Sequence, residues 1–202
     1  MHVQDIFEET DQKRIFDLVE QNAFATLITY DNGVPCANHL PLMVEKGDKI
    51  SLLGHMAKSN SQWQHFNQDN EVLAIFTGPH AYISPSNHQP PGVPTWNYAA
   101  VHMYGKCRVV EDDQLKTIIE SLSHKYEKNQ PSPWIPDYPD RAFQAIVGFE
   151  IVVDRIEAKS KLSQNKSESD RQRIISTLGN SNRDEEKGVA ALMRENEFKV
   201  SS

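Results

Sequence analysis

The sequence predicts an α+β fold in which an antiparallel sheet or small barrel of about six strands carries flanking helices. Two observations predict this fold. Apolar runs of strand length are joined by short hairpin-type turns, and they follow one another without the regular strand–helix alternation of a parallel sheet. The chain of 202 residues is long enough to bury a sizeable core. We expect a single domain over 1–202, with a C-terminal helical segment at about 167–197.

Helices are expected where apolar residues recur every three to four positions. The first covers 10–22, where Thr10 can cap the helix and Asp11 favours its positive N-terminal end. A short helix is expected over 59–66, with a serine or asparagine at its start as the cap. The other helices are expected from 112 or 113 to about 128, within 170–178, and near 185–195.

Strands are expected where apolar and β-branched residues alternate or form short runs. The Asn32-Gly33 pair predicts a tight hairpin between the first two strands. Pro35 and Pro41 predict that the second strand lies at a sheet edge or contains a bulge, and Gly78-Pro79-His80 predicts a turn. The expected strands are 24–30, 34–45, 50–55, 72–77, 95–111 and 146–156, with a short extended piece at 82–84.

Two proline-rich stretches lack any periodicity. Segment 84–94 holds four prolines and is expected to be a long loop, of the kind that is often functional or disordered in compact domains. Segment 129–140 also holds four prolines and is expected to be irregular.

The chain is acidic, with 21 Lys and Arg residues against 28 Asp and Glu residues and a formal net charge of −7. Proteins that bind the phosphate backbone of nucleic acids usually carry the opposite sign, so this balance disfavours DNA as a partner. The most basic region, 159–166 with Arg171 and Arg173, is the candidate patch for such binding.

Membrane and secretory classes are not supported either. No apolar run reaches the roughly 18–20 residues of a membrane span, and no secretory signal is visible at the N-terminus. Cys36 and Cys107 lie in apolar, strand-like stretches. This placement favours two small buried residues in a reducing cytoplasm over a redox role.

Three short segments carry more polar and aromatic residues than plain strand ends need. In the first, 53–63, a strand ends at Gly54-His55 and a helix begins a few residues later. Backbone N–H groups at such a helix start, with the charge of Lys58 and the hydroxyl of Ser59, suit a phosphate. An ordinary capped helix with a solvated lysine explains the same residues, and the spacing leaves both interpretations open.

The other two segments are 94–98 and 159–166. Trp96, Asn97 and Tyr98 could line a flat aromatic ligand, or Trp96 could place its ring in the core of a packed strand. The second of these segments combines cations with neutral hydrogen-bonding side chains, and it could clamp an anion or form a solvated loop.

Metal and nucleophile chemistry have little support in the sequence. It contains no HExxH pair, no Gly-x-Ser-x-Gly elbow and no Gly-x-Gly-x-x-Gly dinucleotide motif. We therefore expect no metal site and assign no catalytic residue.

Five segments, in order and over nearly the whole chain, resemble the PaiB-like family of FMN-binding split-barrel proteins, also called FMN-binding negative transcriptional regulators. The matching stretches are Ala37-Asn38-His39-Leu40-Pro41, Leu53-Gly54-His55-x-Ala57-x-x-Asn60-x-Gln62-Trp63, Ala81-Tyr82-Ile83-Ser84-Pro85-Ser86, Val93-Pro94-Thr95-Trp96-Asn97-Tyr98-x-x-Val101-His102-x-x-Gly105 and Lys161-Leu162-Ser163-Gln164-Asn165.

The resemblance implies a six-stranded antiparallel split β-barrel with flanking helices, related to pyridoxamine 5′-phosphate oxidase. It implies FMN as the cofactor and a homodimer with FMN at the subunit interface. The Lys58-Ser59-Asn60 turn would hold the FMN phosphate, with His55 and Trp63 beside it. The residues implied to line the isoalloxazine or its approach are Thr95, Trp96, Asn97, Tyr98 and His102, and those implied to come from the C-terminal segment are Lys161, Gln164 and Asn165.

Three functions stay open at this point. The family label implies a regulator, the oxidase relatives imply a flavin-dependent oxidoreductase acting on a small substrate, and related split barrels hold haem in place of flavin. The sequence departs from the family pattern at Asn87-His88, where relatives carry an aromatic pair, and at Ser160, which is often aromatic. Both departures remove planar groups near the expected flavin.

Overall fold

The computed structural model describes residues 1–66, 70–88 and 92–200, apart from the side chains of 140 and 197–200. Part of the expected proline-rich loop, 89–91, lies outside the described residues. The chain folds into two compact units.

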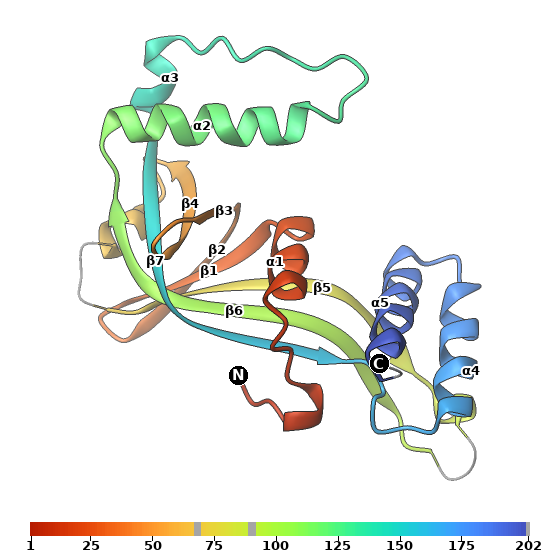
Figure 1. Ribbon diagram of the computed structural model, residues 1–202. Helices are drawn as coiled ribbons and strands as arrows, with labels where there is room; N and C mark the ends of the chain where they lie inside the picture. Colours follow the sequence, from red (N-terminus) through yellow and green to blue (C-terminus); the bar gives the residue numbers. More distant parts are fainter. Residues whose placement is uncertain (67–69, 89–91, 201–202) are drawn as a thin grey trace. The chain divides into compact units, whose positions relative to one another are not determined.

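Seven strands form one sheet in the order β2-β1-β5-β6-β7-β4-β3 (Figure 1). The pairings of β1 with β2 and β5, and of β4 with β3 and β7, are antiparallel. Together with the flanking helices, this confirms the predicted α+β class, with seven strands in place of six. The strands are β1 (Phe24–Asp31), β2 (Val34–Pro41), β3 (Met43–Lys46), β4 (Ile50–Ala57), β5 (Val72–Ile83), β6 (Thr95–Val109) and β7 (Ile146–Lys161).

The additional strand results from a break after Pro41 in the segment expected as one strand over 34–45. β2 ends at Pro41, β3 begins at Met43, and the two strands lie at opposite edges of the sheet. Leu42 between them is buried, and its backbone N–H donates to the carbonyl of Ala23 at 2.9 Å. The predicted edge position of the proline-containing strand is confirmed. β2 also contacts β4, so this part of the sheet curls as in a barrel.

The hairpin between β1 and β2 forms at the predicted Asn-Gly pair. Asn32 and Gly33 have φ angles of 49° and 82°, and Asp31 pairs with Val34 across the turn. Two consecutive positive φ angles in a two-residue loop are the signature of a type I′ turn, which matches the twist of the flanking strands.

The turn predicted at 78–80 is wrong, because β5 continues through it to Ile83. The small residue there serves close packing: a Cβ on Gly78 would lie 3.0 Å from Leu18 Cδ1. Pro79 is packed in the same way, since a Cβ on Gly188 would lie 2.7 Å from Pro79 Cγ. A glycine and a proline that read as a turn thus mark the places where helices approach the strand.

The four longer expected helices are present, but their caps differ in part. The N-terminal helix is capped by Asp11 rather than Thr10, because Asp11 Oδ1 accepts hydrogen bonds from the N–H groups of Lys13 and Arg14. The segment 59–66 forms a five-residue 3₁₀ helix capped by Asn60. The helical elements are η1 (Asp5–Phe7), α1 (Gln12–Gln21), η2 (Ser61–His65), η3 (Pro85–Asn87), α2 (Asp112–Glu127), α3 (Asp140–Gln144), α4 (Glu168–Gly179) and α5 (Asp184–Val200).

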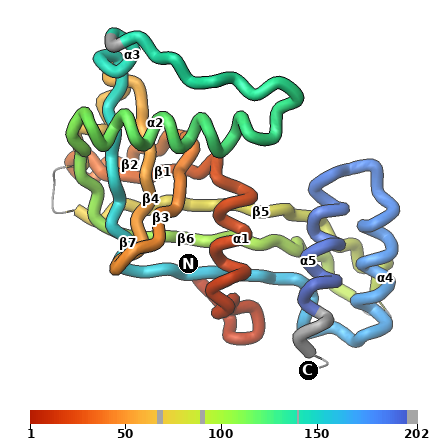
Figure 2. Tube along the Cα trace, turned by 45° about the horizontal axis from the view of Figure 1, so that its top comes forward, coloured from red at the N-terminus to blue at the C-terminus, as the bar shows by residue number. Residues whose placement is uncertain are grey.

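The first compact unit comprises 1–21, 77–101 and 157–202. Here α4 and α5 lie side by side (Figures 1 and 2). Their apolar faces form a core with the end of β5 and with Leu162. Its fully buried members include Ile83, Ile174, Val189 and Ala190.

The second compact unit comprises 22–76 and 102–156. In it α2 covers β4, and α3 contacts α2 (Figure 2). The α2 side of this unit has a core of Leu53, Val110 and the apolar stripe of α2, namely Leu115, Ile118, Ile119 and Leu122. β5, β6 and β7 each run from one unit into the other, and the single-domain assignment stays a prediction.

Among the described residues, none of the helices combines the length and the apolar character required to cross a bilayer.

Candidate flavin site

The turn after β4, predicted to hold a phosphate, is closed by three hydrogen bonds to backbone carbonyls. The Asn60 N–H donates to Ala57 at 2.9 Å, and the Lys58 N–H donates to Ala145 at 2.8 Å. The indole Nε1–H of Trp63 donates to the Lys58 carbonyl at 3.0 Å. Trp63 therefore folds back onto the turn and fixes its backbone.

Lys58 and Ser59 are exposed at the tip of this turn. Within the part of the chain that the structure describes, the Lys58 ammonium has neither a hydrogen-bond partner nor an acidic partner, in contrast to cations such as Arg108 and Arg155. An unpaired cation beside a hydroxyl, on a turn held rigid by its own backbone, suits an anionic group with several oxygens.

The helix that follows contributes less than the sequence predicted. η2 has five residues and 3₁₀ geometry, so it lacks the length that would give it a strong dipole. One of the backbone N–H groups at its start is not available to a ligand, because the Gln62 N–H donates to the side chain of Asn60 at 3.0 Å. The prediction that this turn holds a phosphate therefore rests on Lys58 and Ser59.

A buried network anchors the turn to the sheet, and the sequence interpretation missed it. Gln62 is fully buried, and its side-chain NH₂ donates to the Leu27 carbonyl at 3.0 Å, the Cys36 carbonyl at 3.1 Å and Thr29 Oγ1 at 3.2 Å. Its Oε1 accepts from Asn38 Nδ2 at 3.0 Å. Gln62 and Asn38 both lie in the motif stretches, which is the one signal in the sequence that pointed to them.

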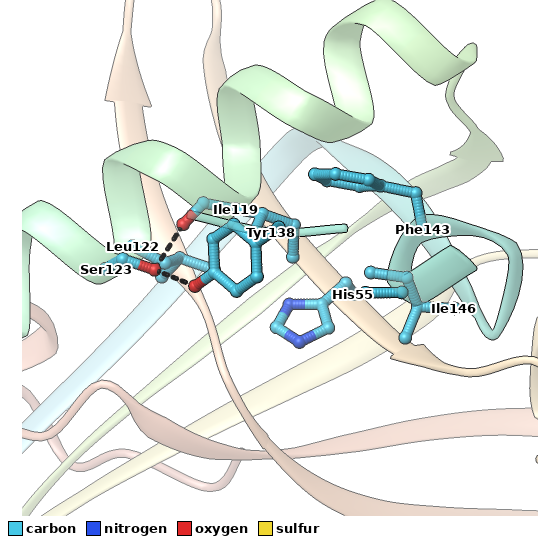
Figure 3. Close-up of a pocket in the computed structure, with 8 residues that line it drawn as sticks. His55, Ile119, Leu122, Ser123, Tyr138, Phe143 and Ile146 are labelled. Carbon is cyan, nitrogen blue, oxygen red and sulfur yellow. Dashed lines mark hydrogen bonds between the residues drawn. The ribbon is translucent and has the colours of Figure 1, made fainter. Parts of the chain in front are cut away.

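His55 lies on β4, and its ring lines a pocket beneath α2 (Figure 3). Burial lowers the pKa of His55 below its ordinary value of 6.5, because the charged imidazolium loses its hydration there. The imidazole is therefore neutral at physiological pH. Its predicted place beside the phosphate stays a prediction.

The first compact unit holds a second group of the predicted residues. The Lys161 ammonium donates to Thr95 Oγ1, which ties the end of β7 to the start of β6. Trp96 is 51% exposed, and its ring centroid lies 6.0 Å from that of Tyr82 and 6.1 Å from that of His80. An exposed cluster of planar rings can stack a flat aromatic ligand.

Asn97 belongs to the core of this unit. It is fully buried, its Nδ2 donates to Ser163 Oγ at 2.9 Å, and Ser163 is 3% exposed. Ser163 also has a φ of 64°, a left-handed conformation that non-glycine residues adopt rarely. Ser163 lies in one of the motif stretches, although it is not among the predicted site residues. Its contact with Asn97 gives it a structural role in the core of this unit.

The remaining predicted residues make local contacts or lie exposed. Lys159 Nζ lies 5.4 Å from the Tyr98 ring centroid, and the amide of Gln164 closes its own turn through Ser160 and Leu162. Asn165 is exposed, and the His102 ring lies 6.3 Å from that of Tyr104.

The predicted site residues thus fall into two groups. His55, Lys58, Ser59, Asn60, Trp63 and His102 belong to the second compact unit, and Thr95, Trp96, Asn97, Tyr98, Lys161, Gln164 and Asn165 belong to the first.

A curled antiparallel sheet, a turn with an unpaired cation and exposed planar rings are compatible with a flavin-binding barrel. Residues 1–155 match the family model described as "Putative FMN-binding domain", and the chain belongs to this family. The family assignment makes FMN the cofactor.

The relatives extend this match over the whole chain. The chain is 40% identical over 201 residues to the "Protease synthase and sporulation protein PAI 2" of Bacillus subtilis, covering 96% of this chain and 97% of that protein. It is 32% identical over 203 residues to an uncharacterized protein of Emericella nidulans, covering 79% and 81% of the two chains.

Two solved structures share the fold. The FAD and heme binding protein from Mycobacterium smegmatis has a TM-score of 0.63 at 13% identity, covering 76% of this chain and 73% of that one. The flavocytochrome Anf3 from Azotobacter vinelandii has a TM-score of 0.61 at 12% identity, covering 79% and 72%. At such identities the likeness concerns the fold alone.

The described residues fit FMN. Lys58 and Ser59, both in the second compact unit, match the charge and the hydrogen-bonding needs of its phosphate.

Proposed function

We propose that the protein binds FMN with Lys58 and Ser59 on the phosphate and acts as a flavin-dependent regulatory protein. The observation that carries the proposal is the exposed Lys58 ammonium, which has no acidic partner among the described residues and lies on a turn held by three hydrogen bonds. A phosphate dianion is the group that such a turn recognises best.

The residues have separable tasks in this proposal. Lys58 supplies charge and Ser59 a hydroxyl donor, while Trp63 and Gln62 hold the turn that carries them. Trp96 and Tyr98, two positions apart on β6, are the residues that would meet the flavin ring. FMN, when bound, supplies one- or two-electron redox chemistry, and the surrounding residues orient it and set its electrostatic environment.

The hydrogen bonds made by the basic segment 159–166 support regulation by an indirect route, without direct DNA binding. Two of its cations are engaged within the protein, because Lys161 donates to Thr95 and Lys159 donates to the His2 carbonyl. Of the two nearby arginines, Arg171 donates to the Lys166 carbonyl. With a net charge of −7, little free positive charge is left for a DNA backbone.

A flavin-dependent oxidoreductase is the second candidate. It is favoured by the pocket at His55, which lies in the same compact unit as the Lys58 turn and has the size of a small substrate.

A homodimer in a reducing cytoplasm is part of the proposal. Trp96 and Tyr82 expose about half of their surface, and such rings are enriched in interfaces. The two cysteines are free thiols, which is compatible with a reducing compartment. Light scattering of the purified protein would give a dimer mass, and a monomer with FMN bound would refute this part.

The central experiment is purification followed by an absorbance spectrum and mass analysis of whatever co-purifies. We expect flavin bands and the mass of FMN, and added FMN should raise the melting temperature. A haem spectrum, or neither co-elution nor thermal stabilisation with FMN, would overturn the cofactor assignment.

Direct regulation is tested by a salt titration on promoter DNA. Indirect action predicts no footprint even at low salt. Specific protection of one promoter sequence would replace the indirect route with operator binding.

A further inference from the structure

The pocket beneath α2 lies wholly within the second compact unit and has a volume of about 250 Å³. His55 from β4 forms one wall, α2 and α3 form the opposite side, and Ile146 closes one end (Figure 3). Its lining residues are His55, Ile119, Leu122, Ser123, Tyr138, Ala142, Phe143 and Ile146.

The imidazole of His55 has no hydrogen-bond partner among the described residues. The two side-chain hydroxyls of the wall are satisfied, since Ser123 Oγ donates to the Ile119 carbonyl at 2.7 Å and lies 2.6 Å from the Tyr138 hydroxyl. Polar groups in a protein interior are normally paired, so the His55 ring marks the place where a guest can hydrogen-bond.

The size and polarity of the pocket select a class of guest. An apolar cavity of about 150 Å³ already accommodates a benzene ring, so 250 Å³ accommodates a single ring with a few further atoms. None of the described lining residues carries a full charge, and burying an ion here would cost the hydration energy of that ion. The guest is therefore uncharged and about the size of one substituted ring.

The hydrogen-bonding group of the guest follows from His55. A neutral imidazole has one donor nitrogen and one acceptor nitrogen, and the tautomer decides which of them is Nδ1. A hydroxyl group can donate or accept, so it satisfies either tautomer. We propose that this pocket is a binding site for a small uncharged phenol-type molecule, whose hydroxyl hydrogen-bonds to the His55 imidazole while its ring contacts Phe143, Tyr138 and Leu122.

The pocket and the phosphate turn are linked by one backbone hydrogen bond. Lys58 donates its backbone N–H to Ala145, which lies between the pocket residues Phe143 and Ile146. The proposal does not depend on FMN.

The test uses three probes of similar size on the purified full chain, with and without saturating FMN. Phenol has the ring and the hydroxyl, toluene has the ring alone, and benzoate carries a charge. We expect phenol to bind in the millimolar range or more tightly, about ten times more tightly than toluene, with benzoate undetectable. The readout is the ¹⁵N chemical shifts of the two His55 ring nitrogens together with amide shifts of Ser123 and Phe143.

Variants assign the preference to His55. His55→Phe keeps a ring in the wall but removes the nitrogen, so phenol should lose its advantage while toluene still binds. Ala142→Phe fills the cavity and should abolish binding of both probes. His124→Gln, an exposed neighbour on α2, is the matched control and should leave all affinities unchanged.

Three results would overturn the proposal. They are the absence of phenol binding to the wild type, an unchanged phenol-to-toluene ratio in folded His55→Phe, and loss of phenol binding when FMN saturates the protein, which would assign the cavity to the flavin. The wild-type comparison of the probes decides the case even if a variant does not fold.

Discussion

The side-chain amide of Gln62 donates a hydrogen bond to the backbone carbonyl of Leu27 at 3.0 Å, in a position with no solvent exposure. Leu27 belongs to β1, and the same amide reaches the Cys36 carbonyl on β2. Gln62 thus connects the short helix after the Lys58 turn to two strands of the sheet. The turn has no long helix to support it, so this buried amide is its main anchor.

Replacing Gln62 by alanine should lower the free energy of unfolding by about 2–4 kcal/mol, because it removes packed atoms and the buried hydrogen bonds to the carbonyls of Leu27 and Cys36. Chemical denaturation measures this loss. FMN affinity should fall as well, although Gln62 reaches no solvent and cannot touch the cofactor. The exposed neighbour Gln64→Ala is the control, expected within about 0.5 kcal/mol of wild type. Equal stability of the two variants would contradict the anchor.

Lys58→Ala should weaken FMN by about ten- to a hundredfold while leaving riboflavin nearly unchanged, because only FMN carries the phosphate that the ammonium would meet. Fluorescence titration with both flavins measures the difference. Lys49→Ala removes an equally exposed cation from the turn before β4 and should bind both flavins as wild type does. Equal losses for FMN and riboflavin in Lys58→Ala would place the phosphate elsewhere.

Local patterns predicted the fold well where neighbouring residues decide the structure. The Asn32-Gly33 turn, the edge position of the strand with Pro35 and the four longer helices all follow from residues close in sequence. The failures come from distant contacts. Gly78 and Pro79 look like a turn in isolation, but the close approach of Leu18 and Gly188 explains them within a continuous strand.

The same distinction applies to the candidate site. The Lys58 turn could be predicted because its residues are contiguous. The Gln62–Asn38 pair is separated by 24 positions, and the Asn97–Ser163 pair by 66 positions. The periodicity of apolar residues in the sequence therefore predicts neither contact. Asn97 was predicted to contact the flavin from its place beside Trp96, but alternation along β6 turns Asn97 into the core and leaves Trp96 exposed. Its role at the flavin stays a prediction.

Asn97→Ala should destabilise the protein by about 1–3 kcal/mol, since it leaves the buried hydroxyl of Ser163 without its partner. Thermal or chemical unfolding measures the effect. Asn165→Ala changes an exposed asparagine a few residues after Ser163 and should be close to neutral. If Asn97→Ala were neutral too, the Asn97–Ser163 pair would contribute nothing to the stability of the protein.

The stability of the protein should decrease as the pH falls below 6.5, in part through His55. Burial lowers the folded-state pKa of His55 from 6.5, so the unfolded chain binds a proton more readily than the folded one. The stabilisation is fully present above pH 6.5 and is lost as the pH falls toward the folded-state pKa. The free energy of unfolding of the wild type, relative to that of His55→Phe, should therefore fall as the pH decreases through this range. A difference that stays constant between about pH 5 and 8 would exclude this contribution.

The two thiols should react at very different rates. Cys107 is 5% exposed on β6, and burial raises the pKa of its thiol far above the ordinary value, with the charge of Glu150 adding to the effect. The thiol therefore stays protonated, and reagents cannot reach it without local opening. Cys36 is only half-buried on the edge strand β2, where Asn38 Nδ2 lies 3.9 Å from its sulfur.

A disulfide reagent should thus modify Cys36 at least about a hundredfold faster than Cys107 in the native protein. Two well-separated kinetic phases, each with the amplitude of one thiol, are the expected result. Cys36→Ser should remove the fast phase and leave the slow one, and denaturant should merge both phases into one in the wild type. A fast phase that persists in Cys36→Ser would mean that β6 opens readily at Cys107, which is incompatible with its burial in the sheet.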